Sequence, residues 1–460
     1  MLDPVTLILM ILFTVVSAIL YIFIGILPGT DETATMAPIL LTLLLAGVDP
    51  LLALAWFMAS IATFKMADSI PVALAGIPGG VMAVPQVPDA LTAKEAGLAD
   101  TVLRKGIASS IVGQFVALAV TLTLSYYLMP FGDWLRAADE VLPGVKVARW
   151  FWILFIGLLI LALTSKNKAL ALLSIPSFAL FIQGIRAVYG KPVSVSLFLG
   201  ITIGPLMLDL LSILYKELRG NYMRKGPVEI KLAKVDKIPL NPFKILTKEE
   251  LVHSALWSAV TSVLATVMSP VGLTILIGDL LKQGKRDKVK GSVLAYTVRD
   301  AVKNATYIGG TIVPLLVIGQ PTGPMSAGPA APFFQKLDIL GTSARDYLIT
   351  HYSYATIALV TLLASAVAFL VSYPMLVKYS RKLTVFVFKS ISAEALYGLL
   401  IAIVLLLAYY DAGIPGLFGT IIVSLVSGVL WRLGVSLGVL FMTLVAAPTL
   451  TAIITKIPSP

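Results

Sequence analysis

Two pairs of charged residues stand inside long apolar segments, where charge is costly. Lys65 and Asp68 lie three positions apart in one segment, and Asp300 and Lys303 lie three positions apart in another. A charged side chain at the centre of a bilayer costs about 2.5 to 3.5 kcal/mol on insertion scales, so such residues are usually functional. Residues three apart share a helix face and can pair. The lysines therefore have two interpretations: structural ion pairs between packed helices, or cations that bind a substrate carboxylate.

The composition explains why these charges are unusual. Of 460 residues, 58% are hydrophobic and only 13% are charged. Apolar runs of about 20 residues recur along the chain, each long enough to cross the hydrocarbon core as a helix. We therefore predict an all-α polytopic membrane protein with about 10 to 13 membrane helices, some broken or re-entrant. The long runs exclude a β-barrel, whose strands are short and alternate. The absence of cysteine excludes thiolate metal sites and cysteine nucleophiles.

The net charge of +11 is concentrated in two hydrophilic segments. Residues 216–250 hold nine basic and five acidic residues, and residues 282–290 hold five basic residues and one acidic residue. Excess lysine and arginine in short loops marks the cytoplasmic side of a membrane protein, so we expect both segments there. The apolar segment 255–281 between them must then cross an even number of times or re-enter. Neither segment is a basic patch interleaved with aromatic residues, so nucleic acid is not an expected partner.

Proline and glycine interrupt four of the apolar segments. The breaks lie around residue 28, within 71–80, around residue 270 and within 314–323. A proline removes a backbone donor and leaves carbonyl groups exposed. At membrane depth such a break survives only where protein or water satisfies the backbone, so the breaks predict sites rather than lipid-facing surface.

The breaks also repeat along the chain. A shift of 243 residues lays 70–84 over 313–327 with five identities in fifteen. The chain therefore reads as two related halves, 1–215 and 251–460, joined by a basic cytoplasmic linker at 216–250. Paired interrupted segments in two halves point to a transporter site near the bilayer midplane. The matched identities are Pro71 with Pro314, Gly76 with Gly319, Pro78 with Pro321, Gly80 with Gly323, and Met82 with Met325.

A broken helix offers a ligand its backbone as well as its side chains. Free N–H groups at a half-helix N-terminus attract anions, and exposed carbonyl groups attract Na⁺, for which no particular residues can be named. Glycine lets a ligand approach the backbone, although close helix packing would also select it. The candidate substrate-binding residues are Lys65, Ser69, Gly76, Pro78, Gly79, Gly80, Lys303, Asn304, Gly319, Pro321, Thr322 and Gly323. The candidates for binding a coupling ion, or for pairing with the lysines, are Asp31, Asp68 and Asp300.

Several of these stretches, in this order, resemble one family of membrane proteins. They are 25–38 (GILPGTDETATMAP), 69–79 (SIPVALAGIPG), 89–97 (DALTAKEAG), 300–321 (DAVKNATYIGGTIVPLLVIGQP) and the C-terminal 413–432. Together they are similar to the large membrane subunit of the tripartite tricarboxylate transporter family. The resemblance implies a small four-helix membrane subunit and an extracytoplasmic solute-binding protein as partners.

The chain departs from the family pattern at ligand-like positions. Gly76 stands for an asparagine, Ala67 and Asp68 stand for a glycine pair, and Lys303 stands for the first of two asparagines. The resemblance therefore predicts the class of protein better than it predicts the substrate.

These observations predict the permease of a secondary active transporter in the cytoplasmic membrane. It would move small organic anions, di- or tricarboxylates, by alternating access coupled to Na⁺ or H⁺. A passive anion channel and a transporter of a non-carboxylate solute are the alternatives. An intramembrane enzyme is disfavoured, because no His-x-x-x-His or Gly-x-Gly-Asp pattern is present and the Ser/Lys pairs are not distinctive. We expect no cofactor, and lipid and the transported anion as partners.

Overall fold

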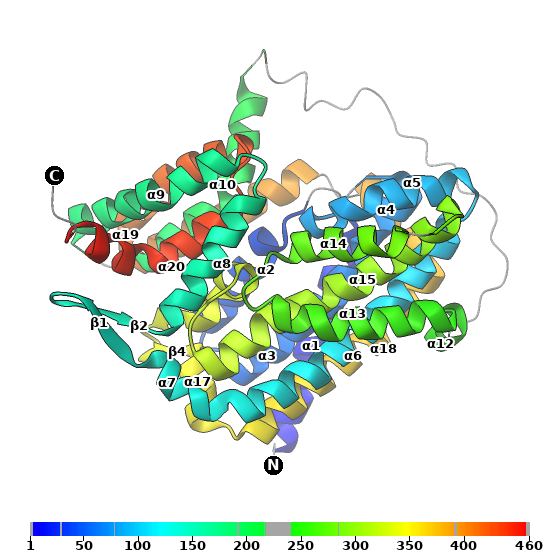
Figure 1. Ribbon diagram of the computed structural model, residues 1–460, viewed down its shortest axis with the longest axis horizontal. Coiled ribbons are helices and arrows are strands. Elements are labelled where there is room, and N and C mark those ends of the chain that lie inside the picture. The colour runs from blue at the N-terminus through cyan, green and yellow to red at the C-terminus, as the bar shows by residue number, and fades with distance from the viewer. Residues whose placement is uncertain are drawn as a thin grey trace.

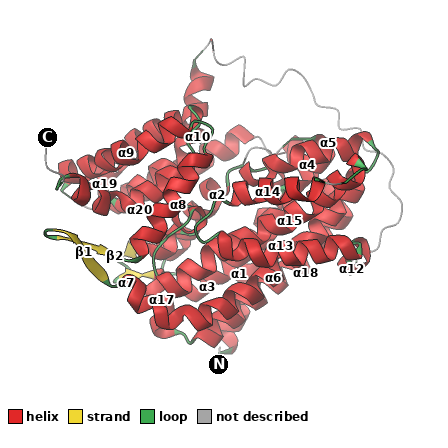
Figure 2. Ribbon diagram, viewed as in Figure 1, coloured by secondary structure: helices red, strands yellow, loops and turns green. Residues whose placement is uncertain are grey.

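The computed structural model describes residues 3–27, 30–77, 79–190, 193–215, 217, 241–283, 285–390 and 393–456. Within them helices dominate, with two short two-stranded ribbons (Figure 2). Most of the basic linker and Pro78 lie outside the described residues.

The first half begins with two helices, α1 (Pro4–Ile26) and α2 (Glu32–Leu45), that flank the expected break near residue 28. The remaining elements of this half are α3 (Pro50–Ala67), α4 (Ser69–Ala75), η1 (Val81–Gln86), α5 (Val87–Glu95), α6 (Ala99–Leu128), η2 (Met129–Phe131), α7 (Gly132–Arg136), β1 (Ala138–Leu142), β2 (Val145–Ala148), α8 (Trp150–Thr164), α9 (Lys168–Tyr189) and α10 (Ser194–Leu214).

The second half is also built mainly from helices. Its elements are α12 (Pro242–Ile245), α13 (Lys248–Leu264), α14 (Pro270–Lys282), α15 (Lys288–Val313), η3 (Pro314–Ile318), α16 (Pro324–Ala327), η4 (Ala331–Phe334), β3 (Lys336–Leu337), β4 (Thr342–Ser343), α17 (Ala344–His351), α18 (Tyr354–Ser390), α19 (Ala393–Arg432) and α20 (Leu437–Ile454). Helix α19 is kinked, because Ala412 and Gly413 leave the helical conformation.

Nine helices of the described chain are long and apolar enough to cross a membrane. Two shorter apolar helices, α2 and α8, add to them. The fold class expected from hydropathy, an all-α polytopic membrane protein, is therefore confirmed.

The expected span at 255–281 consists of two helices, not one. Helix α13 ends at Leu264, and α14 begins at Pro270 with the Ser269 hydroxyl capping its first turn. Beyond the end of α14, the Lys285 ammonium lies 2.5 Å from the carboxylate of Glu249 at the start of α13. The two outer ends therefore meet, and the segment turns back on itself as the charge pattern requires.

The helices form two groups with α2 between them (Figure 1). One group holds α1, α3 to α6, α13 to α15 and α18; the other holds α8 to α10, α19 and α20. Helix α2 packs against α3 of the first group and against α10 and α19 of the second. The most buried helices, α3 and α15, lie in the first group and carry the charged pairs.

The 243-residue shift also aligns helix starts outside the glycine-proline motif. Trp150 and Ser194 begin α8 and α10, and the shift places them on Ala393 and Leu437, which begin α19 and α20. This agreement favours two related halves, and the repeat stays a prediction.

Candidate functional site

The charged pairs predicted from sequence lie on the two most enclosed helices. Every residue of α3 is buried, and so is α15 from Gly291 to Val313. Neither lipid nor water solvates a charge in such a place, so the charge must be paired within the protein.

The ammonium of Lys303 lies in a cage of oxygen atoms. Its Nζ is 2.5 Å from Asp68 Oδ1, 2.7 Å from Ser69 Oγ and 2.7 Å from Asp300 Oδ1. Gln86 Oε1, at the end of η1, lies 3.2 Å away. Ser69 in turn donates its hydroxyl to Asp300 Oδ1 at 2.5 Å. The cage thus joins α15 to the α3–α4 junction and to η1.

Lys65 has a different environment. It forms an ion pair with Glu32 in the first turn of α2, and its Nζ lies 3.8 Å from Asp68 Oδ2. The ring of Tyr307 lies beneath the ammonium, with its centroid 4.0 Å away, which is the geometry of a cation–π contact. Lys65 therefore ties α2 to α3, whereas the sequence suggested Asp68 as its partner.

The five ionisable side chains of this network do not balance. Lys65 and Lys303 face Glu32, Asp68 and Asp300, and none of the five side chains is more than 4% exposed. With every group ionised, the network carries one negative charge in excess. An anion could therefore reach either lysine only after an internal ion pair opens.

Two carboxylate oxygens of the network have spare capacity. Asp68 Oδ2 and Asp300 Oδ2 accept no hydrogen bond from any described residue. A buried acceptor without a donor is rare and needs an explanation, such as a bound proton, water or ion. Asp300 Oδ2 is packed so closely against Gly106 that an added Cβ there would come within 2.0 Å.

Sequence reasoning missed two members of the network, Glu32 and Gln86. In the sequence Glu32 stands out only as the neighbour of Asp31, although it follows a break and opens a helix. The structure instead uses Asp31 as the N-cap of α2, where Oδ1 accepts from the Ala34 N–H at 3.0 Å. Glu32 could have been recognised from the sequence by its position, because it is an acidic residue in the first turn of an apolar helix.

The glycine positions matched by the repeat have matching backbones. Gly76 ends α4 at φ +71°, and Gly319 ends η3 at φ +74°. Gly80 and Gly323 are both extended, at φ −140° and −137°. The left-handed conformation strains other residues, which explains glycine at the first pair.

Each glycine-proline loop packs against the turn of a preceding helix pair. In the first half, Thr30 donates its hydroxyl to Gly79 O at 3.3 Å. In the second half, Thr322 donates to Thr266 O at 3.4 Å, and a Cβ on Gly323 would lie 2.6 Å from that same oxygen. Close backbone packing therefore accounts for part of the glycine requirement.

Asn304, the remaining predicted ligand, lies beside Lys303 on α15 and is fully buried. Both atoms of its amide group lack a hydrogen-bond partner among the described residues. A buried amide has up to four hydrogen bonds to make, so this side chain is a candidate to face a ligand or water.

A second, partly buried ion cluster lies about one turn towards the N-terminus of α15 from Lys303. Arg299 pairs with Asp89 of α5 and, at 2.8 Å, with Asp279 of α14; its Nε also donates to Thr274 O at 3.1 Å. Lys282 adds a contact to Asp89 at 3.2 Å. This cluster fastens α5 and α14 to α15, and its acids and bases are equal in number.

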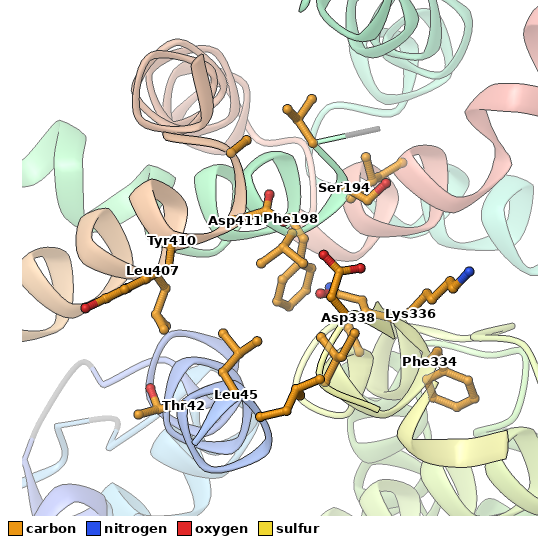
Figure 3. A pocket seen from close by; sticks show the side chains of 18 of the residues that line it. Thr42, Leu45, Ser194, Phe198, Phe334, Lys336, Asp338, Leu407, Tyr410 and Asp411 are labelled. Atoms are coloured by element: carbon orange, nitrogen blue, oxygen red, sulfur yellow. The ribbon is translucent and has the colours of Figure 1, made fainter. Parts of the chain in front are cut away.

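A cavity of about 1430 Å³ lies among α2, the second helix group and the segment 320–339. Its wall is largely apolar, with Leu45 of α2, Phe198 of α10 and Leu407 of α19 facing the space (Figure 3). Charged side chains also line it: Arg186, Lys336, Asp338 and Asp411. Of the predicted substrate-binding residues, Pro321 lines this cavity, next to Gln320.

Comparison with known proteins connects this geometry to a family. Residues 11–442 match the tripartite tricarboxylate transporter TctA family. The chain belongs to this family. No curated protein and no solved structure matches the chain. The resemblance read from the sequence motifs is therefore confirmed over nearly the whole chain.

Membership in the TctA family makes the chain a component of a tricarboxylate transporter. Together with the nine apolar helices of the described residues, it identifies a multi-pass membrane protein. Within this TctA-family chain, two of the positions that depart from the sequence pattern, Asp68 and Lys303, are direct partners at 2.5 Å. These two departures therefore occur together as one ion pair.

Proposed function

We propose that the chain is the permease of a secondary active transporter that moves di- or tricarboxylates across the cytoplasmic membrane by alternating access. The observation that carries the proposal is the buried network around Lys65 and Lys303, with three carboxylates for two ammonium groups. Buried, charged residues in the membrane mark ion and substrate pathways.

The excess negative charge supports coupling to a cation. A substrate with two or three carboxylates would be repelled by a network that is already negative, and repulsion is strong at low dielectric constant. A proton or Na⁺ bound together with the substrate would offset that repulsion. The favoured scheme is therefore symport, in which substrate and cation enter the same conformation.

Helix α2 provides a physical connection between the network and the cavity. Its first residue, Glu32, pairs with Lys65, and its C-terminal part, from Ile39 to Leu45, lines the cavity. We propose that substrate enters this cavity, which Pro321 of the second glycine-proline loop lines. Ser69, Asn304 and the two lysines would contact substrate or coupling ion after the internal pairs rearrange.

The partners follow from the family. A small four-helix membrane subunit and an extracytoplasmic solute-binding protein would complete the transporter, as in the tripartite systems to which TctA proteins belong. We propose transport, not catalysis, as the activity of this chain.

The test is uptake of radiolabelled di- and tricarboxylates by proteoliposomes that contain the chain, with its partner subunits where uptake requires them. A symporter accumulates substrate against its gradient when a proton or Na⁺ gradient is imposed, and stops when the gradient is collapsed. Downhill flux without accumulation would identify a channel instead. Uptake of none of the carboxylates, with accumulation of another solute, would identify a transporter of a non-carboxylate.

A further inference from the structure

The cage around Lys303 has the composition of a cation site. Two carboxylate oxygens, one hydroxyl and one amide oxygen converge on one point at 2.5 to 3.2 Å. Hard metal cations are bound in proteins by this set of donors, carboxylate, hydroxyl and amide oxygens. The point on which they converge is the Lys303 ammonium itself.

A lysine ammonium is a compact point charge equal to that of an alkali-metal ion. It differs in being tethered to the chain by a covalent stem, so it cannot leave with the substrate. The cage is completely buried: Lys303, Asp68, Ser69, Gln86 and Asp300 all have 0% exposure. Without a positive charge at its centre, two carboxylates would be buried side by side, which is strongly unfavourable.

We propose that Lys303 is a built-in cation that occupies a monovalent metal-ion site formed by Asp68, Ser69, Gln86 and Asp300. The assignment of the cage as a cation site rests on its geometry alone. Only its meaning for cation coupling rests on the proposed function. The assignment predicts that the chain needs no Na⁺ or K⁺ at this position, and that removal of the ammonium creates a requirement for one.

Lys65 supplies a matched comparison on the neighbouring helix. Its side chain is equally buried, at 0% exposure, and belongs to the same network. Its surroundings are a single close carboxylate, that of Glu32, a second one at 3.8 Å, and an aromatic face. Among the described residues, removal of this ammonium would leave no comparable set of oxygens, so it should not create a metal-ion site.

The test is thermal unfolding of the purified full-length chain in detergent, titrated with NaCl, with KCl, and with choline chloride as the control for ionic strength. No substrate is added, so the result does not depend on which anion the transporter moves. The variants are Lys303→Asn, which leaves the place of the ammonium open, Lys303→Met, which fills it without charge, and Lys65→Asn.

We expect the Tm of the wild type to respond equally to all three salts. The Tm of Lys303→Asn should be low in choline chloride and should rise, to saturation, with NaCl or KCl; whichever salt acts at the lower concentration identifies the ion that the cage prefers. Lys303→Met and Lys65→Asn should show no such rise. If folded Lys303→Asn responds to the metal salts no more than to choline chloride, the cage is not a cation site and the proposal is wrong.

The wild type and Lys303→Met provide a second test, which does not require Lys303→Asn to fold. If Na⁺ or K⁺ stabilises the wild type specifically over choline, and Lys303→Met abolishes that effect, a metal ion binds with the lysine in place and the proposal is overturned. The double variant Lys303→Asn with Asp300→Asn has the same network charge as the wild type, which favours its folding. It should respond to metal salts at higher concentration, because the cage has lost one carboxylate.

Discussion

The network has three acids and two bases, so substitution of a base should lower the free energy of unfolding more than substitution of an acid. Lys303→Met takes the network from one excess negative charge to two, and it leaves Asp68 and Asp300 without the ammonium that they share at 2.5 and 2.7 Å. Loss of one partner of a buried ion pair costs about 3 to 5 kcal/mol. We expect Lys303→Met to be destabilised by an amount in that range.

Asp300→Asn changes the charge in the opposite direction. It makes the network neutral, and Lys303 keeps Asp68 at 2.5 Å, Ser69 at 2.7 Å and Gln86 at 3.2 Å. In the variant the Lys303 ammonium still has a side-chain oxygen at position 300 to donate to, but a neutral amide replaces the carboxylate, a difference of about 1 kcal/mol. Asp300→Asn should therefore be at least about 2 kcal/mol more stable than Lys303→Met, although the two changes remove the two halves of one ion pair.

The measurement is the unfolding of the wild type, of both single variants and of the double variant Lys303→Met with Asp300→Asn, in one detergent and in choline chloride, followed by tryptophan fluorescence. The double variant restores the wild-type net charge, so its loss should be smaller than the sum of the single losses by about 1 kcal/mol or more. Equal destabilisation by both single changes, or additive losses in the double variant, would refute the charge-balance reasoning.

Two further predictions concern the loops and the topology. Gly323→Ala should destabilise the chain more than Gly184→Ala, because a Cβ at 323 would lie 2.6 Å from the backbone oxygen of Thr266, whereas a Cβ at Gly184 of α9 would meet no described atom within 4 Å. A comparison of Tm values tests this. A cysteine at Lys285, on the expected cytoplasmic side, should resist an impermeant thiol reagent in intact cells. A cysteine at Lys146 should react, because the span Ala99–Arg136 places it at the opposite end of the bundle. The reverse labelling pattern would contradict this orientation.

The fold class could be predicted because the hydropathy of a segment shows whether it lies in lipid or in water. A long apolar segment in a bilayer must form a helix to satisfy its own backbone hydrogen bonds, so the composition excluded the other fold classes. The breaks were visible for a similar reason, since glycine and proline act on the local backbone. Thus the end of α4 at Gly76 and the end of η3 at Gly319 follow from residue type and position.

The sequence predicted most residues of the network, but it did not predict which of them pair with each other. Charge inside apolar segments identified Lys65, Asp68, Asp300 and Lys303, because burial makes each of them costly. Spacing along one helix then suggested partners within that helix. The closest contacts instead join residues that are distant in sequence, Lys65 with Glu32 and Lys303 with Asp68. Pairing between helices depends on how the helices are packed, which a single sequence does not contain.

The position of α2 connects the charge balance to the proposed movement. A helix of 14 residues is about 21 Å long, and α2 has its first residue in the network and its last turns at the cavity. It contacts α3 in one helix group and α10 and α19 in the other, so a shift between the groups must change at least one of these contacts.

The Glu32–Lys65 pair lies on the α3 side. Neutralising Glu32 would remove the electrostatic attraction that holds α2 to α3, while its packing against α10 and α19 would remain. A cation or proton bound at the network would therefore favour movement of α2 with the second group, which is the kind of link that a coupled transporter requires.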